Sequence, residues 1–136
     1  MKGLTLSRSF FDTCGQEAMK KVFPALVDRM AFGLCGEGSE CFGFDDALSR
    51  DHDWGPGFCI WMDDADYRQS GAAVQAVYCQ ALQTFPDAEK RKDTGQGAGR
   101  VGVLSIQNWY QRYTGLPEGP GTLAEWRPIP EAFLAT

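Results

Sequence analysis

The chain has 136 residues, of which 43% are hydrophobic and 23% are charged, and its formal net charge is −5. This composition is typical of a folded protein about one domain long and excludes wholesale disorder. The negative charge disfavours a basic surface for nucleic acid or for an anionic membrane. No apolar run approaches the roughly 20 residues that span a bilayer, and the first residues lack the apolar stretch of a signal peptide. We therefore expect a cytoplasmic protein.

The cysteines are odd in number and contain no C-x-x-C pair. This pattern argues against a disulfide framework and against a structural zinc site. Reduced, mostly buried thiols are expected at Cys14, Cys35, Cys41, Cys59 and Cys79.

In the first half of the chain, apolar residues recur at steps of three and four between Phe10 and Leu26. They predict an amphipathic helix over residues 7–28, with Ser7 as its N-cap. The apolar run at 30–35 predicts a buried strand that leads into a tight glycine turn. A second strand is expected over 51–62, and Pro56 indicates an edge position or a bulge near its start.

In the second half, Asp63 and Asp64 predict the beginning of a helix over residues 65–85. Residues 87–100 are charged and glycine-rich and indicate a loop. A third strand over 101–106, a helical turn or two over 107–113 and short helical pieces around Trp126 follow. The order of these elements predicts a single α/β or α+β domain over residues 1–136, with a small mixed sheet flanked by helices.

Acidic side chains, glycines and the only histidine of the chain gather in residues 36–57. Asp51 and Asp53 are one residue apart at the start of a predicted strand, so their carboxylates are expected on one side, with Cα atoms roughly 6.5–7 Å apart. Such a pair can share Mg²⁺, which completes its shell with water and substrate phosphates. Solvated acid pairs are also common, so the pair alone does not define a metal site.

A glycine-serine turn is expected directly after the predicted strand at 30–35. Gly38 lets a phosphate approach the backbone, and Ser39 offers both its N–H and its hydroxyl to a phosphate oxygen. A phosphate there and a metal at the aspartates require the two strands to be neighbours, which the 11 residues between Ser39 and Asp51 permit. Such a site would bind a nucleoside triphosphate such as ATP. Glu40 is expected to orient the turn, while Arg50 either contacts a phosphate or balances local charge.

The motif Gly38-Ser39, Gly43 and the run S-x-D-x-D at 49–53 resembles the signature of the nucleotidyltransferase fold of DNA polymerase β type. More closely, GEGSECFGFDD followed by SRDHDWGPG resembles the DUF4037 family, whose members carry a nucleotidyltransferase-like domain at their N-terminus. The resemblance implies a mixed sheet with a helix before the turn and Mg²⁺- or Mn²⁺-dependent transfer of a nucleoside monophosphate. It also implies that Gly38 and Ser39 contact the triphosphate and that Asp51 and Asp53 hold the metal.

One feature departs from the implied pattern. Active members of that superfamily usually bring a third carboxylate from a later strand, whereas the predicted strand at 101–106 contains no acid. DUF4037 chains also continue into a helical C-terminal region, so a fragment or a short form is one interpretation of this chain. The acidic residues that could substitute for the third carboxylate are Glu40, Asp45, Asp46, Asp63 and Asp64.

Two other interpretations of the acidic stretch stay open. The chain can be a non-catalytic nucleotide-binding or protein-interaction module of the same fold, or the acidic residues can form a purely structural loop. A calcium loop at 51–62 is rejected because Met62 occupies the position that needs a bidentate glutamate. The glycines at 95–99 lack the lysine and hydroxyl of a phosphate-binding P-loop. The basic run at 90–92 is short and gives no strong signal for nucleic acid.

Overall fold

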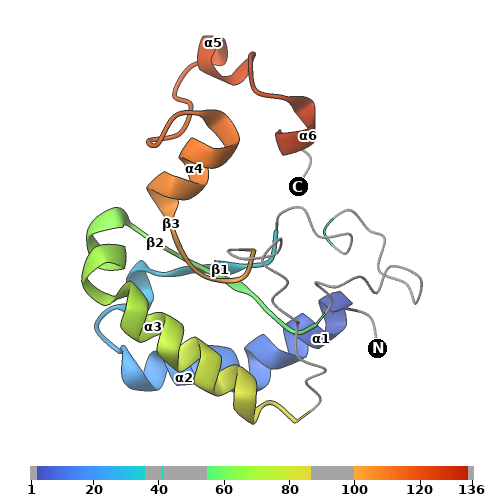
Figure 1. Ribbon diagram of the computed structural model, residues 1–136, viewed down its shortest axis with the longest axis vertical. Helices are drawn as coiled ribbons and strands as arrows, with labels where there is room; N and C mark the ends of the chain where they lie inside the picture. Colours follow the sequence, from blue (N-terminus) through green and yellow to red (C-terminus); the bar gives the residue numbers. More distant parts are fainter. Residues whose placement is uncertain (1–2, 36–40, 42–54, 87–99, 135–136) are drawn as a thin grey trace.

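The computed structural model describes residues 3–35, 41, 55–86 and 100–134. Within these ranges a three-stranded mixed sheet is flanked by helices, which confirms the predicted mixed α/β class (Figure 1). In chain order the elements are α1 (Gly3–Phe10), the π-helix η1 (Phe11–Gly15), α2 (Gln16–Val22), the 3₁₀-helix η2 (Val27–Arg29), β1 (Ala31–Gly33), β2 (Cys59–Met62), α3 (Asp64–Thr84), β3 (Gly102–Ser105), α4 (Ile106–Thr114), α5 (Leu123–Trp126) and α6 (Glu131–Leu134).

The central strand of the sheet is β2, which pairs antiparallel with β1 and parallel with β3. The long helix α3 connects β2 to β3, as a crossover between parallel neighbours requires. Of the two alternatives that Pro56 indicated for the second strand, the edge position is wrong, because β2 has a neighbour on each side. Pro56 is buried and lies before the first residue of β2, where its missing N–H disturbs no strand pairing. In the described part of residues 51–62, the strand begins at Cys59.

The N-terminal helix differs from its prediction in where it begins and in which face it buries. It begins at Gly3, so Ser7 lies inside α1 and is not an N-cap. A π-helical turn holds one residue more than an α-helical turn, and η1 therefore shifts the register of everything after Phe10. The buried positions accordingly run from Phe10 to Gly15 and Met19, while Val22 of the expected stripe is 51% exposed.

Aromatic side chains form the centre of the core between these helices, α3 and the sheet. The ring of Phe58, just before β2, lies 5.3 Å from Phe10, 5.1 Å from Phe11 and 5.1 Å from Tyr78 between ring centroids. Gly15 allows this packing, because a Cβ atom there would lie 2.4 Å from the Phe58 ring. The helices α1, α2 and α3 thus cover one side of the sheet (Figure 1).

The C-terminal helices lie on the other side of the sheet (Figure 1). Ser105 ends β3 and caps α4, since its Oγ accepts the Asn108 N–H at 3.2 Å. Trp109 of α4 makes an edge-to-face contact with Trp61 of β2, with ring centroids 6.0 Å apart. The predicted short helical pieces around Trp126 are confirmed as α5 and α6.

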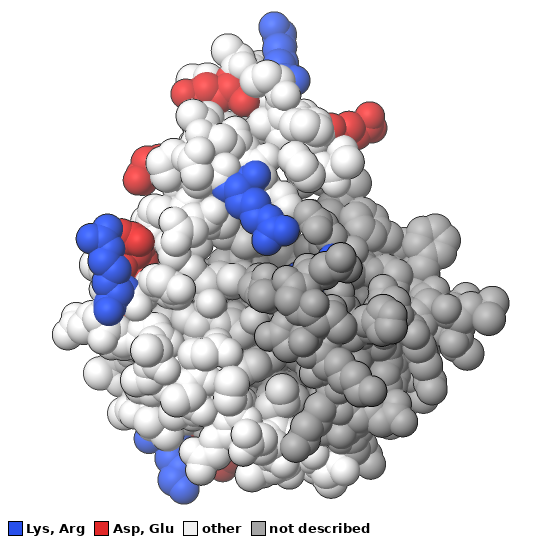
Figure 2. Space-filling model, in the orientation of Figure 1, with Lys and Arg blue, Asp and Glu red and all other residues white. Residues whose placement is uncertain are grey.

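All five cysteines lie within the described residues, and none of them forms a disulfide bond. Cys59 is buried, Cys79 is exposed and the other three are half-buried, so the expectation of mostly buried thiols holds only in part. On the face of the molecule shown in Figure 2, the Lys and Arg side chains of the described residues lie scattered and form no patch. Among the described helices, none combines the length and the apolar character needed to cross a membrane.

Candidate functional site

The two segments that carry the candidate motifs join neighbouring strands at the same end of the sheet. Gly33, the last residue of β1, pairs with Cys59, the first residue of β2. The chain leaves β1 toward residues 36–40 and returns to β2 from residues 42–54. The sequence argument requires the strand before the glycine-serine turn and the strand after the aspartate pair to be neighbours, and the pairing of β1 with β2 meets this condition.

The residues expected to bind nucleotide and metal lie outside the described residues. The candidate positions outside the described ranges are Gly38, Ser39, Glu40, Asp45, Asp46, Arg50, Asp51 and Asp53.

Two backbone hydrogen bonds fix the residues that lead into β2. The Gly57 N–H donates to the Oγ of Ser7 at 3.2 Å, and the Phe58 N–H donates to the Tyr78 hydroxyl at 3.3 Å. Both bonds are buried, which makes them costly to break. Ser7, expected as a helix cap, is therefore an anchor that ties α1 to the start of β2. Its sequence spacing from Gly57 gave no signal for this contact.

The strand beside β2 supplies no third carboxylate. In β3, Leu104 is the residue paired with Trp61, and none of the four residues is acidic. The proposed substitutes Asp63 and Asp64 stand at the opposite end of β2, with Asp63 about 13 Å along the strand from Cys59. Asp63 caps α3 and Asp64 pairs with Arg68, so both have structural roles. No group of three potential metal-ligating side chains occurs among the described residues.

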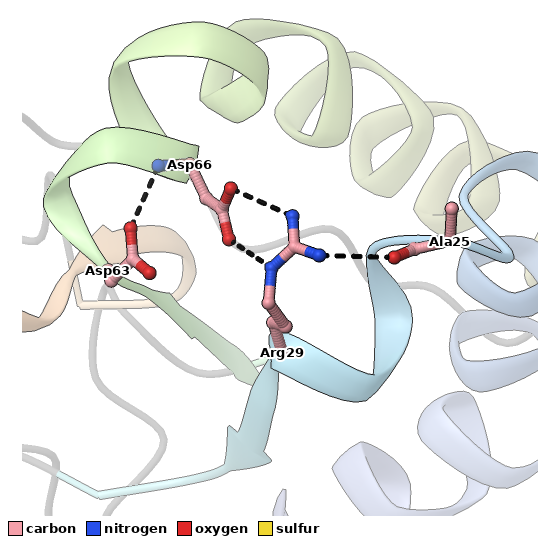
Figure 3. A network of polar contacts seen from close by, with 4 residues as sticks. All are labelled: Ala25, Arg29, Asp63 and Asp66. Carbon is pink, nitrogen blue, oxygen red and sulfur yellow. Dashed lines mark hydrogen bonds and ion pairs between the residues drawn. The ribbon is translucent and has the colours of Figure 1, made fainter.

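A polar network ties η2 to the beginning of α3 (Figure 3). The Arg29 guanidinium donates to both carboxylate oxygens of Asp66, at 2.8 and 3.0 Å, and to the Ala25 carbonyl at 3.4 Å. The hydrogen bond from Arg29 lowers the pKa of the Asp66 carboxyl, and the same bond raises the pKa of Arg29. The Asp66 N–H in turn donates to Asp63 at 2.9 Å. The network therefore links η2 to α3 through charged groups that are paired with each other.

Two cavities lie beside the edge where β1 and β2 meet. The first has a volume of about 290 Å³ and lies between α1 and the sheet, with Phe11, Phe32 and Phe58 in its wall. Its polar side chains are engaged, since Ser7 accepts the Gly57 N–H and Arg8 pairs with Asp12 at 2.8 Å. An apolar wall with satisfied polar groups offers little to a phosphate.

The second cavity, of about 200 Å³, lies against α4 and the end of β1. Cys35 and Cys59 line it together with Arg100, Asn108 and Arg112. Burial raises the pKa of the Cys35 thiol, so this thiol stays protonated at neutral pH and is no nucleophile there.

The sequence interpretation missed both arginines of this cavity. The sequence pattern places Arg100 at the end of a charged loop and Arg112 in a short helix, and it indicates no binding role for either residue. A signal was present in the spacing of Asn108 and Arg112, which are four residues apart and so share one face of a helix.

Comparison with known protein families, with curated proteins and with solved structures gave no significant match to this chain. The resemblance to nucleotidyltransferases therefore depends on the motif residues in the sequence.

Proposed function

We propose that this chain is a nucleotidyltransferase-like domain that binds a nucleoside triphosphate such as ATP, together with Mg²⁺ or Mn²⁺, and transfers the nucleoside monophosphate to an acceptor. The observation that carries the proposal is the antiparallel pairing of β1 with β2. It joins the glycine-serine segment and the aspartate segment to one edge of the sheet, as a shared phosphate and metal site requires.

The arrangement of the described elements is compatible with this fold. The resemblance implies a mixed sheet with a helix before the glycine-serine turn. The described sheet is mixed, and α1, η1 and α2 precede β1. The second cavity, between the sheet and α4, leaves room for a ligand beside the strands.

The proposal gives each motif residue a distinct role. Gly38 and Ser39 bind phosphate oxygens through backbone N–H groups and a hydroxyl, and Glu40 orients that turn. Arg50 contacts a phosphate. Asp51 and Asp53 hold the divalent cation, whose remaining positions suit water and phosphate oxygens. When bound, the cation neutralises charge on the phosphates and favours attack by the acceptor hydroxyl.

Calorimetry tests the proposal directly. Wild type is expected to bind ATP more tightly with Mg²⁺ than without it, and a variant with Asp51→Ala and Asp53→Ala is expected to lose this Mg²⁺-dependent gain. A matched control carries Glu17→Ala and Glu118→Ala, which remove the same charge at two exposed positions. Equal Mg²⁺-dependent binding by wild type and the aspartate variant would refute the proposed site.

A specific observation favours a second candidate, a non-catalytic nucleotide-binding module of the same fold. The neighbouring strand β3 contributes no acid, so a third carboxylate would have to come from elsewhere in the chain than the superfamily pattern implies. Pyrophosphate release separates the two functions, because transfer of a nucleoside monophosphate liberates pyrophosphate. Binding of ATP without pyrophosphate release, in the presence of tRNA, protein and small-molecule acceptors, would favour the module.

A further inference from the structure

Two guanidinium groups from different parts of the chain meet at the second cavity. Arg100 lies two residues before the first residue of β3, and Arg112 lies in the last turn of α4. Both line the cavity of about 200 Å³ beside Cys35. The residues between them in sequence form β3 and most of α4, so the fold itself brings the two charges to one cavity. Two cations that the fold brings together are stronger evidence for an anion-binding site than two neighbouring cations on a surface helix.

The other polar groups of the cavity suit an anion as well. Asn108 contributes a side-chain amide, and the first turn of α4, which begins after Ser105, also lines the cavity. The beginning of a helix carries partial positive charge and N–H groups that point outward. The described residues that line the cavity include no aspartate or glutamate. The described lining residues thus combine two guanidinium groups with neutral hydrogen-bonding groups.

The guanidinium carbon of Arg112 lies 5.4 Å from the centre of the Tyr113 ring, within the range of a cation–π contact. An arginine presents its donors in a planar fork that matches two phosphate oxygens, which a lysine does not.

We infer that this cavity binds the phosphate groups of the nucleotide, with Arg100 and Arg112 as its cationic side chains. The inference rests on the proposed function for the identity of the ligand. The cavity includes Cys35, which lies three residues before Gly38 in the sequence. Arg100 and Arg112 are thus substrate-binding residues that the motif does not contain.

Inorganic tripolyphosphate without any divalent cation is the probe, because it presents the phosphates without the base or the metal. Calorimetry would compare full-length wild type with Arg112→Gln, Arg100→Gln and Arg112→Lys. Each glutamine variant is expected to weaken binding at least about tenfold, as loss of a charge-assisted hydrogen bond does. Arg112→Lys is expected to recover only part of the loss. Arg127→Gln removes the same charge from an exposed position outside the cavity and should bind like wild type.

The thermal unfolding of each variant would be measured alongside binding. Arg112 is exposed, so its variant is expected to fold normally even if the Arg100 variant does not. Absence of tripolyphosphate binding by wild type, or equal losses in Arg112→Gln and Arg127→Gln, would overturn the inference.

The outcome is distinguishable from the test of the proposed function. If ATP binding depends on Asp51 and Asp53 but tripolyphosphate binding is unchanged in Arg112→Gln, the nucleotide site stands and the arginine subsite is refuted. If tripolyphosphate binding depends on Arg112 while ATP binding ignores the aspartates, the anion subsite stands and the nucleotidyltransferase proposal fails.

Discussion

Replacing Gly15 with alanine would test how η1 packs against the sheet. An added Cβ atom would lie 2.4 Å from Cε1 and 2.6 Å from Cζ of Phe58. Carbon atoms pack at about 3.5–4.0 Å, so the ring or the helix would have to move by about 1 Å. Phe58 is 3% exposed and packed against other rings, so such a shift is an overpacking defect of about 1–3 kcal/mol.

Alanine also favours a helix over glycine by up to about 1 kcal/mol, which offsets part of this defect. The expected net result of Gly15→Ala is a loss of about 1–2 kcal/mol in the free energy of unfolding, which lowers Tm by about 3–8 °C in a chain of this size. Calorimetric or circular-dichroism melting would measure it. Adding Phe58→Leu should make the cost of Gly15→Ala smaller, because the smaller side chain gives way.

Gly71→Ala is the matched control, since it makes the same change in α3. There the nearest atom to a new Cβ lies 3.1 Å away on Tyr67, so only a shift of a few tenths of an ångström is needed. This control should be nearly neutral. A Gly15→Ala variant as stable as wild type, or as stable as Gly71→Ala, would refute the packing argument.

Three further changes test other contacts. The Asp66 pKa is lowered by Arg29 from its ordinary value of about 3.9, so the pair stabilises the protein above that pH and stops doing so as the pH falls through the lowered value. The Tm difference between wild type and Asp66→Asn should therefore shrink below about pH 4, and a constant difference from pH 7 to pH 2.5 would contradict this reasoning. Ser105→Ala removes the cap of α4 and should lower the free energy of unfolding by about 1 kcal/mol in urea titrations, whereas Ser105→Thr should keep most of it. Gln75→Leu leaves the Val103 N–H without its 2.9 Å acceptor and should cost about 1 kcal/mol; slower amide hydrogen exchange at Val103 would argue against it.

The class and order of most elements could be predicted from hydrophobic pattern and capping residues. The helix after β2 is a clear example, because Asp63 is its N-cap and Pro86 follows its end, and both signals are local. The central position of β2 could not be predicted, since Pro56 gave only local information. Which strands pair depends on contacts between distant residues.

The buried face of the N-terminal helix is a second feature that could not be predicted from the sequence. A regular period of 3.6 residues predicts that Val22 lies on the buried face, but η1 shifts the face toward Met19. A π-helical turn depends on tertiary packing, here of Gly15 against Phe58, and leaves no periodic signal in the sequence. In the same way, the spacing of Asn108 and Arg112 predicts that they share one face of α4. It does not predict the cavity, because Arg100 joins the lining only through the fold.

The π-helical turn also allows this chain to lose one residue there without a change in which helix face is buried, which a regular helix does not allow. Removing one exposed residue, Thr13, would allow the segment to close into a continuous α-helix. The intervals between Leu6, Phe10, Gly15 and Met19 would then all be four residues, and all four would remain on one stripe. Related chains that are one residue shorter at this place could thus keep the same helix–sheet contact, and an alignment gap here would not signal a change of fold.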